Sequence, residues 1–251
     1  MDLRFKDLFL MKWEKYFGKA ELPMTFLYSD DEKYEKYLHP VRGHVCMVGQ
    51  LNLVLSGRIL AFAKETIGCH GGIRYCGFPL EYNADFKYFL SYGIPGKLEG
   101  ERYKKTPEIV EEYMEKTPLP KAEGKYVVFK RWDSLEVDDE PKGVIFFAPP
   151  DVLSGLFTLA NYPSLDPLAV ITPFTAGCGS IIGYPLAEAE KENPRAVIGM
   201  FDVSARPHLD KNLLSFAAPM KKFKQMVDDM DESFLITGSW ERVTKRIANG
   251  R

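Results

Sequence analysis

Hydrophobic and polar positions follow two alternating periods along this chain, and the changes of period predict the order of its elements. The first 22 residues place apolar side chains at helical spacing among charges, which is typical of an amphipathic helix. A turn at Pro40–Gly43 precedes a second helical pattern over His44–Leu55. Further helices are predicted at Pro107–Lys116, at Val152–Ala160 with Asp151 as its cap, and at Pro219–Met230.

Short apolar runs rich in β-branched and aromatic residues predict the strands. They lie at Met24–Tyr28, Ile59–Ala63, Tyr126–Lys130, Val144–Ala148, Ala169–Thr172, Ala196–Met200 and Leu213–Ala217. Strand runs that are apolar on both faces and are linked by helices are typical of parallel sheets. We therefore expect an α/β (or α+β) fold with a mixed, largely parallel sheet covered by helices. Residues 1–251 form one domain in this interpretation, with 82–124 as a peripheral insertion or lid.

Composition narrows the classes of partner. Apolar residues make up 45% of the chain, and 33 basic side chains against 35 acidic ones give a net charge of −2, so no overall field attracts nucleic acid or anionic lipid. The most basic stretch, Met220–Lys224, has the pattern of the solvated face of a helix. An export signal and a run of ~18 apolar residues are both missing, so we expect a cytoplasmic protein without membrane contact. A homo-oligomer is compatible with these features.

An internal repeat carries the candidate chemistry. Ile59–Tyr82 and Ala169–Glu188 both read as an apolar strand, then T-x-G-C, then G-[F/Y]-P-L. Such a unit predicts a strand, a glycine turn and a helix that begins at Cys69 or Cys178. Free N–H groups at a helix start stabilise a thiolate, and ligands bind at strand ends in open α/β sheets. Plain burial in the core is the alternative for any cysteine.

The four cysteines predict a shared thiolate site. Cys46 also stands near a helix start, and Cys76 is a potential fourth member. Three or four thiolates from separated segments suit an iron–sulfur cluster or a soft metal ion, with Cys46, Cys69 and Cys178 as ligands and a redox or sensing role. No C-x-x-C pair is present, which argues against a zinc ribbon.

Two other functions stay open. A thiol-dependent enzyme would use one of these cysteines on a small anionic substrate, with Asp202 and Arg206 as positioning groups; an internal loop contact is the alternative role for that pair. A non-catalytic binding module would instead use a pocket lined by Tyr75, Phe78 and Tyr184. The expected partners are therefore a small molecule or a redox partner.

Several of these segments resemble one prokaryotic family. They are the Cys46 helix with its Met-Val pair, the Cys69 and Gly177-Cys178 segments, and the Ser215–Pro219 run that leads into the last predicted helix. Together they resemble the family known as domain of unknown function 169, from about Phe17 to the end of the chain. The resemblance implies that Cys46, Cys69 and Cys178 occupy the family's cysteine positions and that Cys76 belongs to this branch. It implies no activity.

Overall fold

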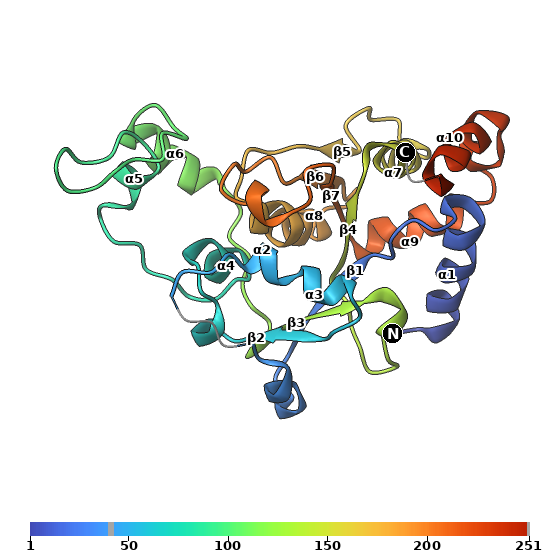
Figure 1. Ribbon diagram of the computed structural model, residues 1–251, viewed down its shortest axis with the longest axis horizontal. Coiled ribbons are helices and arrows are strands. Elements are labelled where there is room, and N and C mark those ends of the chain that lie inside the picture. Colours follow the sequence, from blue (N-terminus) through green and yellow to red (C-terminus); the bar gives the residue numbers. More distant parts are fainter. Residues whose placement is uncertain (40–42, 250–251) are drawn as a thin grey trace. The chain divides into compact units, whose positions relative to one another are not determined.

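The computed structural model describes residues 1–39 and 43–249 (Figure 1). Three of the four residues of the expected turn at Pro40–Gly43 lie outside these ranges. The helices are α1 (Leu3–Phe17), α2 (Met47–Gln50), α3 (Asn52–Leu55), α4 (His70–Tyr75), α5 (Phe86–Phe89), α6 (Pro107–Lys116), α7 (Pro150–Asn161), α8 (Tyr184–Ala189), α9 (Met220–Asp229) and α10 (Gly238–Ala248), with a π-helical turn at Gly179–Gly183 before α8. The strands are β1 (Met24–Ser29), β2 (Leu60–Phe62), β3 (Tyr126–Arg131), β4 (Gly143–Ala148), β5 (Val170–Ile171), β6 (Ala196–Gly199) and β7 (Leu214–Pro219).

The strands form one sheet in the order β2-β3-β1-β4-β7-β6-β5. Within the described ranges, β5 and β6 are the one parallel pair, and all other neighbours run antiparallel. The mixed α/β class is confirmed, but the expectation of a largely parallel sheet is wrong.

The reason for the error lies in how the sheet is covered. Along β4, Val144 and Phe146 enter one hydrophobic core, whereas Ile145 and Phe147 enter another on the opposite face. The first core is packed by α1, α7, α9 and α10, and the second by α2, α3, α4 and the π-helical turn (Figure 1). A strand that is buried on both faces is apolar at successive positions whether its neighbours are parallel or antiparallel. The apolar pattern therefore indicated burial and carried no information about strand direction.

The internal duplication is also not supported. Its first strand, β2, lies at one end of the strand order, and its second, β5, lies at the other end. Cys69 precedes α4 with an extended backbone (φ −140°, ψ 143°), whereas Cys178 is already helical (φ −61°, ψ −33°). The two similar sequences therefore fold into different local structures.

Most predicted elements are present with ends that shift by one or two residues. The predicted helix over His44–Leu55 is instead two short helices, α2 and α3, with Leu51 between them. Asp151 does not cap α7, because that helix begins one residue earlier, at Pro150. The Asp151 carboxylate pairs with Arg246 Nε at 3.0 Å and so connects α7 to α10.

The chain divides into two compact units. One comprises the described residues of Met1–Phe78 and Pro120–Arg251, and it contains the sheet. The other is Pro79–Leu119, in which α5 and α6 contact each other and Ile94 N donates to Leu98 O at 2.7 Å.

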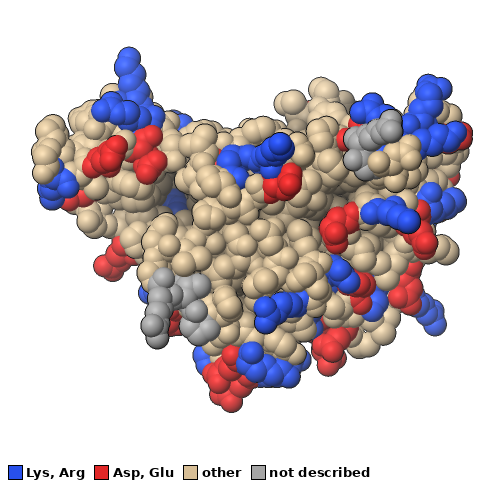
Figure 2. Space-filling view, in the orientation of Figure 1, with Lys and Arg blue, Asp and Glu red and all other residues tan. Residues whose placement is uncertain are grey.

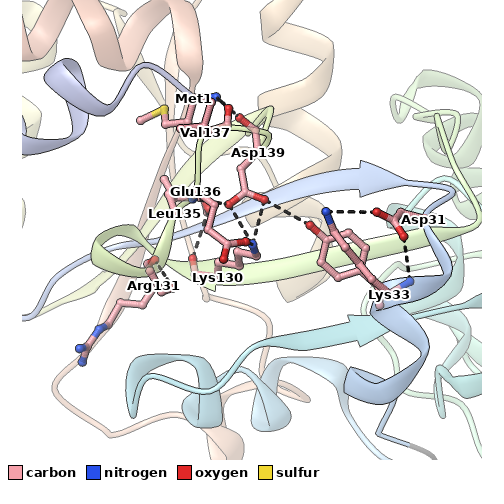
Figure 3. Close-up of polar contacts among 12 residues, drawn as sticks. Met1, Asp31, Lys33, Lys130, Arg131, Leu135, Glu136, Val137 and Asp139 are labelled. Carbon is pink, nitrogen blue, oxygen red and sulfur yellow. Dashed lines mark hydrogen bonds and ion pairs between the residues drawn. The ribbon is translucent and has the colours of Figure 1, made fainter.

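A buried ion pair connects β3 to the chain segment that follows it (Figure 3). Lys130 Nζ lies 2.9 Å from both carboxylate oxygens of Asp139, and these two side chains are almost fully buried. Asp139 also accepts from Glu136 N at 2.7 Å and from Tyr34 Oη at 3.2 Å. The Met1 ammonium donates to the carbonyl oxygens of Val137 and Asp139. With one cation and several donors on it, the buried carboxylate is fully hydrogen-bonded, as such groups require.

Charged side chains of both signs are interspersed over the face drawn in Figure 2. Among the described residues, none of the helices has the length and apolar character needed to cross a bilayer.

Candidate thiolate site

Two cysteines precede short helices, and one of them caps its helix with sulfur. Cys46 is the N-cap of α2, but its side chain makes no capping hydrogen bond. Cys69 is the N-cap of α4, and its Sγ lies 3.4 Å from the N–H nitrogen of Gly72. A sulfur at this position takes the place of the usual oxygen cap and points its lone pairs at free backbone donors.

The two capped helices are held together by their backbones. Val45 N donates to Gly68 O at 3.3 Å, so the residues preceding each cysteine are in direct contact. The N–H of Met47 at the start of α2 lowers the pKa of Cys69. Backbone groups of its own helix and of the neighbouring helix therefore both favour the Cys69 thiolate.

Gly72 makes this approach sterically allowed. A Cβ at this position would lie 2.7 Å from Ile67 Cγ2, 3.1 Å from Cys69 Sγ and 3.3 Å from Met47 Cβ. Any larger residue would push the sulfur or α2 away. The backbone of Gly72 is helical and could be adopted by any residue. Glycine is needed there because a side chain would collide with its neighbours.

Cys178 approaches Cys69 from the second half of the chain. It lies at the start of the π-helical turn and is 4% exposed, and its thiol lowers the pKa of Cys69. Asp202 supports this segment, since its Oδ2 accepts from Gly177 N at 3.0 Å. Tyr75 completes the contact between α4 and the turn, because its ring lies where side chains at Gly179 and Gly183 would be.

These contacts give the cysteines different acidities. The pKa of Cys69 is lowered to about 6, first by the hydrogen bond from the Cys178 thiol and then by the N–H groups of Met47 and Gly72 and the charge of His44, all acting against burial. The pKa of Cys178 is raised well above its ordinary value by the same hydrogen bond, by burial and by the negative charge on Cys69. The pair therefore carries a single negative charge, on Cys69.

The other two thiols remain protonated near neutral pH. Burial raises the pKa of Cys46 although the nearby N–H groups of Val48 and Gly49 oppose the rise. It raises the pKa of Cys76 further, since that side chain has no exposed surface. Cys76 Sγ lies 3.5 Å from Met47 Sδ inside the core. Both feel the charge on Cys69, which adds to their rise in pKa.

The side chains of the two loop residues expected to bind an anion are used in internal hydrogen bonds, and Arg206 N also donates to Asp202 O at 3.1 Å. The Arg206 guanidinium donates to Leu213 O at 2.6 Å and to Lys211 O at 2.8 Å. Besides Gly177 N, Asp202 accepts from the N–H and the hydroxyl of Ser204. Arg206 thus stabilises its own loop, whereas Asp202 connects that loop to the Cys178 segment.

The arrangement does not present a three-ligand metal site. In the described part of the chain, no group of three or more His, Cys, Asp and Glu side chains is placed to hold a metal ion. Cys178 lowers the pKa of Cys69, whereas the charges of Cys46 and Cys76 raise the pKa of Cys178. The expectation of an iron–sulfur cluster or soft metal on Cys46, Cys69 and Cys178 thus gains no support and stays a prediction.

The proposed pocket walls are themselves packed. Tyr75 and Phe78 are buried, and the Tyr75 hydroxyl lies 3.1 Å from Thr175 Oγ1. The Tyr75 ring fills space against the π-helical turn, Phe78 belongs to the same core, and Tyr184 is half-buried, so these rings offer little surface to a ligand.

The backbone donor on the Cys69 sulfur was not among the features predicted from the sequence. The relevant motif is C-x-x-G, which occurs at Cys46–Gly49 and again at Cys69–Gly72. In each copy the glycine is the third helical residue, and in the second copy its N–H donates to the cysteine sulfur. A cysteine followed three residues later by glycine at a predicted helix start was the available signal.

Comparison with known proteins identifies a family. A model of the family DUF169, described as "Uncharacterised ArCR", matches residues 17–229. No curated protein matches the chain, and no solved structure does. Since the match spans well over half of the 251 residues, the chain belongs to the DUF169 family.

Proposed function

We propose that this protein performs thiol-dependent chemistry in which the Cys69 thiolate attacks an electrophilic small substrate. One observation carries the proposal: Cys69 caps α4 with its sulfur, which lies 3.4 Å from the Gly72 nitrogen, and the Met47 N–H and the Cys178 thiol also lower its pKa. Hydrogen bonds to an ionised acceptor are about twice as strong as those between neutral groups. Donors of this kind favour the thiolate, which is the nucleophilic form of cysteine.

Accessibility separates Cys69 from the other cysteines. Cys69 is half-buried, whereas Cys76 and Cys178 are buried and would meet a substrate only after movement. Cys46 is also half-buried, but its raised pKa keeps it protonated and slow to react. A reagent that enters from solvent therefore meets one activated sulfur.

The nearby charges indicate how a small anionic substrate would be oriented. Arg206 is committed to backbone carbonyls, so it is a poor anion ligand. His44 is exposed and close enough for its charge to favour the Cys69 thiolate. We infer that His44 would meet an anionic group, and that Asp202 acts as a positioning residue through Gly177.

Alkylation at graded pH tests the proposal. Reduced full-length protein is treated with iodoacetamide from pH 4 to pH 9, and modified peptides are quantified by mass spectrometry. Modification of Cys69 should follow a single ionisation with a midpoint of about 6. A midpoint near the ordinary thiol value of ~8.5 would remove the physical basis of the proposal.

Two variants sharpen this experiment. Cys69→Ser should abolish the alkylation that has its midpoint at about pH 6. The control Cys46→Ser, which changes the cysteine before α2, should leave the Cys69 midpoint unchanged. Anaerobic purification with metal analysis and visible absorption tests the competing function, iron–sulfur or soft-metal binding. A coloured or metal-loaded protein whose Cys69 resists alkylation until the metal is removed would favour that function instead.

A further inference from the structure

Cys69 and Cys178 differ in exposure and in charge, and the proposed function makes no use of this difference. Cys69 is half-buried and negatively charged, whereas Cys178 lies behind it, is 4% exposed and keeps its proton. Enzymes that exchange disulfides use this division, with one accessible sulfur that attacks and a second that displaces the product. Cys69 corresponds to the accessible sulfur that attacks, and Cys178 corresponds to the second sulfur.

The backbone around the two sulfurs brings them close without a direct connection in sequence. A Cβ on Gly71 in α4 would lie 4.0 Å from the Ala176 Cβ, so the chain beside each cysteine is within van der Waals distance of the other. Each segment is independently supported, Cys69 by Gly72 N and the Cys178 segment by the Asp202 carboxylate at Gly177 N. The two cysteine-bearing segments are therefore packed against each other in the reduced protein.

We propose that Cys69 and Cys178 form a redox-active dithiol that reduces small disulfide compounds and becomes an internal disulfide. This inference rests on the proposed function, because it requires Cys69 to be the attacking sulfur. It adds the substrate class and a role for the buried partner. In a reducing compartment such a disulfide is transient, as expected for a catalytic or sensing bond.

The reaction balances in two steps. The Cys69 thiolate attacks one sulfur of the substrate RS–SR′, the substrate S–S bond breaks, and R′S⁻ leaves with the Cys69–SR mixed disulfide behind. Cys178 then gives its proton to the released thiolate and attacks Cys69 Sγ, which expels RS⁻. Two cysteines are oxidised by two electrons in total, and the substrate disulfide is reduced to two thiols.

The charge on Cys69 gives these steps an order. While Cys69 is charged, that charge and burial raise the pKa of Cys178, which stays protonated. Formation of the mixed disulfide removes the charge, and with it one cause of the raised pKa of Cys178. The second sulfur is released for attack only after the first has reacted.

The test uses reduced full-length protein and bis(2-hydroxyethyl) disulfide, an uncharged small disulfide. Released 2-mercaptoethanol is counted, and peptides are mapped without reduction. Wild type should release two equivalents for each Cys69 that reacts and should yield a peptide joined through Cys69 and Cys178. Cys178→Ser should release one equivalent and accumulate the mixed disulfide on Cys69.

The outcomes separate this inference from the proposed function. A stable mixed disulfide on wild-type Cys69, or a bond from Cys69 to Cys46, would overturn the dithiol while leaving the thiolate nucleophile intact. Absence of reaction at Cys69, together with an ordinary alkylation midpoint, would overturn both. Cys46→Ser serves as the matched control and should still release two equivalents. Since the wild-type map needs no substitution, the result does not depend on how Cys178→Ser folds.

Discussion

The four cysteines of this protein differ in acidity because their surroundings differ. Gly72 N donates to the Cys69 sulfur and the Met47 N–H and the Cys178 thiol also lower the pKa of Cys69, whereas the Cys46 side chain makes no capping hydrogen bond. Burial opposes ionisation at every one of them, and only at Cys69 do the donors outweigh it. The sequence motif C-x-x-G marks the helix caps, but the third donor comes from a distant segment and was not predictable from local sequence.

The stability of the protein should therefore depend on pH through Cys69. Its pKa is about 6 in the folded state and ordinary when unfolded, so the stabilisation is complete above the unfolded value and disappears as pH falls through 6. Denaturant unfolding at pH 5 and pH 8 checks this. The free energy of unfolding of wild type relative to Cys69→Ser should rise by about 2 kcal/mol between these pH values. A difference that does not change with pH would contradict it.

Two adjacent glycines in α4 provide a matched test of the sulfur cap. A methyl group at Gly72 would lie 3.1 Å from Cys69 Sγ, whereas one at Gly71 would have its nearest neighbour at 4.0 Å. Gly72→Ala should weaken the hydrogen bonds to the sulfur and raise the alkylation midpoint by roughly one pH unit, which is the worth of about one hydrogen bond to a charged group. Gly71→Ala should leave the midpoint unchanged. Equal midpoints in both variants would argue that the cap does not control the acidity.

At the scale of elements, the sequence predicted where helices and strands lie along the chain better than it predicted how the strands pair. The strand and helix ranges were mostly correct because each reflects a local apolar pattern. Strand direction was wrong because β4 is covered by a core on each face, and its continuous apolar run carries no information about its neighbours. Similar sequences around Cys69 and Cys178 also adopted different backbones, since their surroundings differ.

The packing of α7 against α10 gives a prediction at this scale. A Cβ at Gly155 would lie 2.3 Å from the Trp240 ring and 2.9 Å from Phe17, so Gly155→Ala overpacks the core shared by three helices. We expect a loss of about 1–3 kcal/mol in the free energy of unfolding. Gly238→Ala, in α10 and with open space around it, should stay within about 0.5 kcal/mol of wild type. Urea unfolding of both variants measures the difference, and equal losses would show that the contact is unimportant.

At the scale of the whole molecule, Pro79–Leu119 departs from and returns to nearly the same point of the larger unit. Ala122 N donates to Gly77 O at 2.9 Å, and a side chain at Gly77, whose φ is +82°, would collide with the backbone of Lys121 and Ala122. The polar and aromatic composition of residues 82–124 predicted a peripheral insertion or lid. The close approach of the two ends was not predictable, because it depends on pairing that composition does not report.

Removal of this unit should therefore leave the sheet intact. Replacing residues 80–119 by a short Gly-Ser linker should preserve a cooperative unfolding transition within about 5 °C of the full chain, since the ends are already adjacent. The Cys69 alkylation midpoint should also persist. Gly77→Ala in the full chain is the comparison, and it should destabilise by forcing the two ends apart. Loss of cooperative unfolding on removal, with Gly77→Ala unaffected, would refute the independence of the larger unit.

The covered sheet also separates the molecule's two natural spectroscopic reporters. All three indole rings, Trp13, Trp132 and Trp240, belong to the core on one face, while every cysteine belongs to or packs against the core on the other. Fluorescence emission and thiol accessibility consequently observe opposite halves of the same domain. Recording tryptophan fluorescence and thiol accessibility during one denaturation experiment would reveal whether the two layers unfold in a single cooperative transition or whether one unfolds first.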